Sequence, residues 1–140
     1  MSALNPNYPV AWFVLGQVYL EQERFDEAFA AHENLAHMPF WSFVLGQTYA
    51  WTGQTDKALE IAGGYERETS NAIPLTIIAA ALGDVDETLH WASQARENKL
   101  PWAAGFFSYF TATRSLHKDP RIQAEAALYP TPLVPYPKIE

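Results

Sequence analysis

The chain has 140 residues, of which 49% are apolar and 18% are charged, and its formal net charge is −7. This composition suffices for one folded domain and excludes wholesale disorder. The acidic balance, with nine scattered Lys and Arg residues, argues against duplex nucleic acid and anionic membranes as partners, because both reward clustered positive charge.

Cysteine is missing from the sequence, which rules out a disulfide framework and a thiolate metal site. Residues 1–10 lack the basic start and apolar core of a signal peptide. The longest nearly apolar run, residues 72–82, is far shorter than the ~20 residues that a membrane span needs. These features predict a soluble, cytoplasmic protein.

A repeat with a spacing of thirty residues organises the chain. Residues 13–17, FVLGQ, return without change as residues 43–47. A third, more divergent copy follows at the same spacing, with Gly53 returning as Gly83 and Asp56 as Asp86. A fixed spacing of this size is typical of a small supersecondary unit stacked on its neighbours.

Each copy is expected to be a hairpin of two helices. Pro9 suits the first turn of the first helix, and breaks are expected at Met38-Pro39 and over residues 98–101. Turns are expected at residues 22–24, 52–54 and 82–84, with Gly53 free to adopt a left-handed conformation. The sequence therefore predicts an all-α fold with three hairpins in residues 9–100.

The remaining residues are expected to form a cap and a tail. The aromatic spacing over residues 102–116 predicts one helix that covers the open end of the stack. Asp119-Pro120 can begin a short helix that reaches about residue 128. Residues 101–128 are thus a predicted capping segment, and residues 129–140, with four prolines, are a predicted extended tail.

The repeat resembles the tetratricopeptide family, which places Trp, Leu-Gly and Tyr on a first helix and small residues on a second. The first copy fills these positions with Trp12, Leu15, Gly16, Tyr19, Ala28 and Leu35, and the second with Leu45, Gly46, Tyr49, Ala58, Ala62 and Tyr65. The repeat length of 30 instead of 34 residues and the Thr76, Ala79 and Thr88 of the third copy depart from the family. Residues 80–92, 101–102 and 116–121 are similar to the C-terminal ends of bacterial tetratricopeptide regulators.

The resemblance implies a solenoid whose first helices line a concave groove for a protein or peptide partner. The groove residues that it implies are Phe13, Val14, Gln17, Glu21, Phe43, Val44, Gln47, Trp51 and Ile77. Amides at Gln17 and Gln47 would bond a peptide backbone. A Phe43→Glu substitution would then abolish partner binding and leave the helices intact.

Two alternatives remain for the apolar face. It can pack against the chain's own terminal helix or against a second copy, since large exposed apolar patches are rare on monomers. A homodimer is compatible both with an interaction module and with a sensing domain. The Pro-rich tail can also lie there. A different function is the sensing of a small molecule or peptide in a pocket formed by Trp51 and the aromatic residues of 102–110.

No constellation of residues indicates catalysis, a metal or a cofactor. His32 and His37 are five positions apart and do not share a helical face. The acidic residues Asp84 and Asp86 fall at a helix start, where they cap the helix and favour its dipole. The sequence therefore predicts a non-catalytic interaction module without a cofactor.

Overall fold

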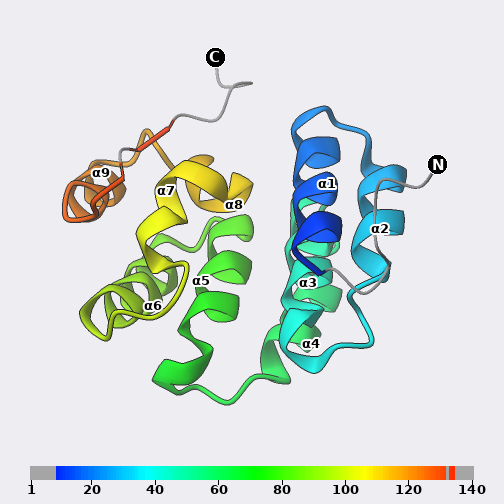
Figure 1. The fold of residues 1–140 in the computed structure, drawn as a ribbon, viewed down its shortest axis with the longest axis horizontal. Coiled ribbons are helices and arrows are strands. Elements are labelled where there is room, and N and C mark those ends of the chain that lie inside the picture. The colour runs from blue at the N-terminus through cyan, green and yellow to red at the C-terminus, as the bar shows by residue number, and fades with distance from the viewer. Residues whose placement is uncertain (1–8, 132, 135–140) are drawn as a thin grey trace.

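The computed structural model describes residues 9–131, 133 and 134. Within this part of the chain the secondary structure is entirely helical (Figure 1), which confirms the all-α prediction. None of the helices in these residues is both long and apolar enough to cross a bilayer.

Three helical hairpins occupy the residues in which the repeat predicts them (Figure 1). In each hairpin the two helices pack on each other. Short 3-10 turns at Pro39–Ser42 (η1) and Thr69–Asn71 (η2) precede the second and third hairpins. The six helices are α1 (Pro9–Glu21), α2 (Phe25–Glu33), α3 (Phe43–Trp51), α4 (Thr55–Gly63), α5 (Ala72–Ala81) and α6 (Val85–Glu97).

The three hairpin turns share one backbone conformation. The middle residue of each turn has a positive φ, at Glu23 (61°), Gly53 (84°) and Gly83 (78°). The residue after it donates a backbone hydrogen bond five positions back in each turn, from residue 24 to 19, 54 to 49 and 84 to 79. The sequence repeat is thus a repeat of turn geometry, and the expected left-handed Gly53 is confirmed.

Packing between the hairpins runs through α3. This helix contacts α2 of the first hairpin and α5 of the third. Gly46 is the close contact to α5: a Cβ built there would lie 3.0 Å from Cδ1 of Ile78. Gly16 has the same role within the first hairpin, where the ring of His32 covers its Cα. Both glycines of the repeated FVLGQ segment therefore permit close approach.

The prediction of a single helix over residues 102–116 is wrong. The chain instead forms the 3-10 turn η3 (Ala103–Gly105) and two short helices, α7 (Phe106–Tyr109) and α8 (Thr111–Arg114). Phe110 separates these helices with an extended backbone, φ −96° and ψ 121°, and its ring lies 5.4 Å from that of Phe13. This contact with the first hairpin accounts for the break, which the local aromatic spacing does not reveal.

The last helix, α9 (Pro120–Ala126), confirms the short helix expected after Asp119. The Asp119 side chain accepts a hydrogen bond from the backbone N–H of Arg121 at 2.8 Å and caps it. Helix α9 packs on α6 at the end of the row of hairpins. Of the predicted tail, Tyr129 is buried and its hydroxyl donates to the carbonyl of Ala92 at 3.1 Å, whereas residues 132 and 135–140 lie outside the described residues.

Candidate functional site

The face of the first helices that was expected to form an open groove is largely covered by the chain itself. Helix α8 packs against both α1 and α5. Phe13 and Phe43 are both buried, at 3% and 2% exposure, and their rings pack on each other, with centroids 6.2 Å apart. Of the nine expected groove residues, Val14 is exposed, Glu21 and Trp51 are half-buried, and the others are buried: Phe13, Gln17, Phe43, Val44, Gln47 and Ile77.

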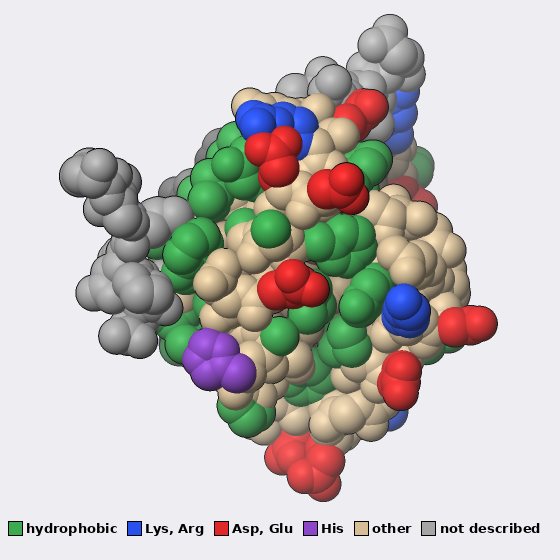
Figure 2. All heavy atoms as spheres, turned by 90° about the vertical axis from the view of Figure 1, so that its right-hand side faces the viewer, with side chains coloured by type: hydrophobic (Ala, Val, Ile, Leu, Met, Phe, Trp, Pro, Cys, Tyr) green, Lys and Arg blue, Asp and Glu red, His purple; other side chains and the backbone are tan. Residues whose placement is uncertain are grey.

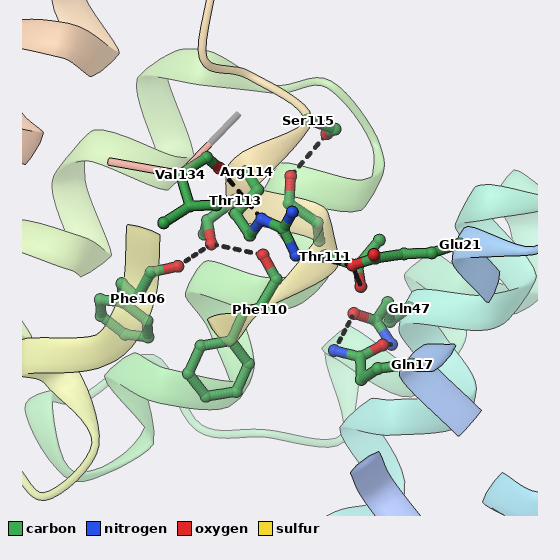
Figure 3. A network of polar contacts seen from close by, with 11 residues as sticks. Gln17, Glu21, Gln47, Phe106, Phe110, Thr111, Thr113, Arg114, Ser115 and Val134 are labelled. Atoms are coloured by element: carbon green, nitrogen blue, oxygen red, sulfur yellow. Dashed lines mark hydrogen bonds and ion pairs between the residues drawn. The ribbon is translucent and has the colours of Figure 1, made fainter. Parts of the chain in front are cut away.

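The two repeated glutamines bond each other. The side-chain N–H of Gln17 donates to Oε1 of Gln47 at 3.2 Å, and that of Gln47 donates to Oε1 of Gln17 at 3.0 Å (Figure 3). This reciprocal pair is buried and ties α1 to α3. Each amide thus uses one of its two N–H groups and one acceptor position of its oxygen on the other amide.

An ion pair holds α8 against the first hairpin (Figure 3). Oε2 of Glu21 accepts from the guanidinium of Arg114 at 2.7 Å and from the hydroxyl of Thr111 at 2.8 Å. The Arg114 Nε also donates to the carbonyl of Val134 at 3.0 Å. Glu21 was expected to line the groove. It instead anchors α8, which covers the groove.

We expect Glu21→Gln to lower the free energy of unfolding by about 1–2 kcal/mol, because it leaves the shielded Arg114 without its carboxylate. The double variant with Arg114→Gln should lose about 1 kcal/mol less than the sum of the single variants. Urea unfolding followed by circular dichroism measures all three. Strictly additive losses would contradict a coupled pair.

The matched control is the exposed pair between Asp86 and Arg121, whose N···O distance is 2.6 Å. Its side chains are 85% and 58% exposed. Asp86→Asn should therefore cost no more than about 0.5 kcal/mol in the same assay.

An aromatic pocket remains open where η1, the start of α5 and residues 100–110 meet. Its volume is about 280 Å³. None of the described residues that line it is charged, and Ser70 supplies the polar side chain among them. The lining residues are Phe40, Trp41, Phe43, Ser70, Ile73, Leu100, Pro101, Trp102 and Phe110. We refer to this space as the aromatic pocket.

The rings around the aromatic pocket pack on one another. Trp41 meets Trp102 edge to face, with centroids 6.0 Å apart and an interplanar angle of 83°. Trp41 and Phe40 make a similar contact at 6.2 Å and 88°. On its other side Trp41 stacks on Phe43 at 6.0 Å and 21°. These contacts fix the aromatic wall before any ligand arrives.

Trp102 adopts a backbone conformation that bulky residues rarely occupy. Its φ is 78°, and its side chain is 48% exposed at the mouth of the pocket. Lys99, three residues earlier, also has a positive φ, 53°. Such conformations cost of order 1–3 kcal/mol each and cluster at binding sites. Lys99 has the turn geometry of the three hairpins, since the N–H of Leu100 donates to the Ala95 carbonyl at 3.0 Å after α6 ends. The conformation of Trp102 is therefore the one that points to a binding site.

A second hollow, which we call the side channel, adjoins the aromatic pocket. Its volume is about 380 Å³, and it shares Trp102 and Phe110 with the pocket. Val14 and Val18 of α1 form its apolar rim, at 50% and 45% exposure. The described residues that line it are Phe13, Val14, Gln17, Val18, Glu21, Trp102, Ser108, Phe110 and Arg114.

The structure therefore divides the expected groove residues between two spaces and the core. The side channel takes Phe13, Val14, Gln17 and Glu21, and the aromatic pocket takes Phe43. The other four, Val44, Gln47, Trp51 and Ile77, line neither space. The predicted groove does not include Trp41 or Trp102. Their signal in the sequence is that each lies shortly after a proline at a helix break, Pro39 for Trp41 and Pro101 for Trp102.

The titratable groups with strong pKa shifts can be compared with the lining of the two hollows. The groups with the strongest pKa shifts lie elsewhere: burial lowers the pKa of His32 to about 4 and raises the pKa values of Tyr65 and Tyr129. Neither His32 nor either tyrosine lines the aromatic pocket or the side channel. Among the described residues, no group of three or more His, Asp or Glu side chains is placed to hold a metal ion.

The surface elsewhere follows the acidic composition. On the face drawn in Figure 2, acidic side chains are scattered among apolar ones, and the Lys and Arg side chains lie apart from one another. Comparisons of the chain with protein-family models, with curated proteins and with solved structures found no match.

Proposed function

We propose that this protein is a non-catalytic interaction module, with a tetratricopeptide-like arrangement of its hairpins, that holds a segment of a partner protein. The observation that carries the proposal is that the aromatic pocket and the side channel share Trp102 and Phe110 as lining residues. One extended segment that crosses this ridge would place a side chain in each hollow.

Exposure and strain support this site over the rest of the surface. Phe40 and Trp102 are 46% and 48% exposed at the pocket, and Val14 is 50% exposed at the channel. Apolar side chains gathered around a hollow are typical of a binding surface. Tryptophan is also enriched among the residues that dominate binding energy. The left-handed backbone of Trp102 lowers the stability of the fold, and such conformations cluster at binding sites.

The proposed partner is a peptide segment because the two hollows differ in chemistry. The aromatic pocket is lined almost wholly by apolar side chains, whereas the side channel adds Ser108, Glu21 and Arg114. Polar groups beside an apolar rim suit a peptide, whose backbone carries donors and acceptors. The net charge of −7 disfavours nucleic acid and anionic membranes as partners. We also propose a cytoplasmic location.

Photocrosslinking tests the proposal at a defined position. Val14 is replaced with p-benzoylphenylalanine, and the crosslinked material from the cell that makes the protein is mapped by peptide mass spectrometry. We expect one segment of another protein. Leu128, 61% exposed and outside both hollows, is the matched control position and should not capture that segment.

The mapped segment is then synthesised and its affinity is measured by titration calorimetry. Trp102→Ala should weaken binding by about 30-fold, as expected for a tryptophan hot spot, and Leu128→Ala should leave it unchanged. Crosslinks within the chain or to a second copy, or an affinity that Trp102→Ala leaves unchanged, would overturn the proposal.

A second candidate is the sensing of a small apolar molecule, which the enclosed, uncharged lining of the aromatic pocket favours. The pocket would use Trp41 and Trp102, not the Trp51 that the sequence suggests. Such a ligand would raise the melting temperature of the wild type. It would not change the melting temperature of a variant in which a larger side chain, as in Ser70→Phe, fills the pocket.

A further inference from the structure

We infer that the aromatic pocket receives an aromatic side chain of the partner segment, in preference to an aliphatic or a cationic one. The inference rests on the proposed function and specifies the residue that this site reads. It is carried by the volume, the charge and the ring geometry of the pocket.

The volume suits a ring. A dry engineered protein cavity of about 150 Å³ holds benzene, and the aromatic pocket measures about 280 Å³. One benzyl or indole group fits this space, with its Cβ at the open mouth between Phe40 and Trp102. A small aliphatic side chain would leave part of it empty and lose those contacts.

The charge of the lining argues against a cation. Aromatic walls can hold methylated ammonium groups, so this alternative must be separated from a neutral ring. The described lining residues include no Asp or Glu. Phe43 already stacks on Trp41, so that face is not open to a cation. A cation would therefore lose hydration without gaining a carboxylate.

The ring geometry favours a further aromatic group. Trp41 meets both Phe40 and Trp102 nearly at right angles, at 88° and 83°. Edge-to-face contact is a preferred geometry for aromatic pairs. An incoming ring can extend this arrangement along the walls, whereas a leucine gains only the burial of its surface.

Blocked amino acids test the side-chain preference directly. N-acetyl-phenylalaninamide, N-acetyl-leucinamide and N-acetyl-trimethyllysinamide are titrated into the full chain, and the indole N–H signals are followed by NMR. Trp41→Phe and Trp102→Phe spectra assign the two signals. We expect the phenylalanine probe to shift both signals with at least threefold tighter binding than leucine, and the trimethyllysine probe to shift neither.

A pocket-filling variant separates specific from diffuse binding. Ser70 is exposed at the pocket wall, so Ser70→Phe fills the space without creating a cavity. It should abolish the shifts, and Glu68→Phe, an exposed neighbour outside the pocket, should retain them. If leucine or trimethyllysine binds as well as phenylalanine or better, the aromatic preference is overturned and the binding module stands. If none of the probes shifts the two signals, or Ser70→Phe leaves the shifts unchanged, the inference and the proposed site both fall.

Discussion

Replacing Gly16 with alanine should lower the free energy of unfolding by about 3 kcal/mol, although alanine is the better helix former. The cause lies across the hairpin. The His32 ring sits directly on the Cα of Gly16, and a Cβ there would overlap the ring. The ring cannot move away without losing its contacts with Thr48 and with the Phe13 carbonyl, at 2.8 Å and 3.4 Å.

The repeat supplies a matched control at Gly46, thirty positions later. A Cβ on Gly46 would meet Cδ1 of Ile78 at 3.0 Å and Cγ2 of Ile61 at 3.2 Å, which are ends of flexible side chains. The helix preference for alanine, about 1 kcal/mol, should offset this crowding and leave Gly46→Ala within about 1 kcal/mol of the wild type. Urea unfolding compares the two variants. Equal losses would show that the His32 contact is not what distinguishes them.

The sequence predicts the local parts of this fold well. A thirty-residue repeat places the hairpins, and their turns depend on residues within a few positions of each other, such as Gly53 and Gly83. The N-caps Asp84 and Asp119 are equally local, since each accepts a backbone hydrogen bond from within its own first turn. Features of this kind need no knowledge of distant contacts.

Packing of the apolar face against the chain's own terminal helix is one of the two alternatives that the sequence leaves open, but the residues that make this contact could not be predicted, because they are distant in the chain. The ring of Phe110 packs against that of Phe13. Arg114 pairs with Glu21, which lies 93 positions earlier in the chain. Residues 102–116, considered without the rest of the chain, show only a helical spacing of aromatic residues. The Phe43→Glu substitution, predicted to leave the helices intact, should instead unfold the chain, because Phe43 is part of the core.

The sequence suggests a pocket at the aromatic residues of 102–110, of which Trp102 and Phe110 line the aromatic pocket, but it names the wrong partner for them, Trp51. The walls of the aromatic pocket come from three stretches, residues 40–43, 70–73 and 100–110, and only folding brings them together. A left-handed tryptophan is also unexpected, because nothing in the Pro101-Trp102 pair specifies a positive φ. The candidate site is therefore a property of the tertiary structure, whereas the hairpins that carry it are a property of the repeat.

Stability should also fall with mild acid, and His32 is the cause. The ring is fully buried at the junction of α1, α2 and α3. Nδ1 of the ring lies 2.8 Å from the Thr48 hydroxyl, which itself donates to the Val44 carbonyl at 3.0 Å, and Nε2 lies 3.4 Å from the Phe13 carbonyl. Burial lowers the pKa of His32 from 6.5 to about 4, because the ring has given up water that would solvate its charge.

The sign follows from which state binds the proton first. As the pH falls below 6.5 the unfolded chain takes up a proton on residue 32, and the folded chain does not until about pH 4. Acid therefore favours unfolding throughout this window. The free energy of unfolding should be about 2 kcal/mol lower at pH 5 than at pH 7.5. Arg67 lowers the pKa of Glu87, so that carboxylate loses its stabilising charge only at lower pH.

Urea unfolding at pH 7.5, 6 and 5 measures the effect, with His32→Gln as the comparison. The variant should be less stable at neutral pH, because it repacks a filled site, but its stability should change little between pH 7.5 and 5. Histidine NMR signals give an independent result on the wild type. The His32 ring should remain neutral at pH 5, and a ring that titrates near pH 6.5 in the folded protein would contradict the argument.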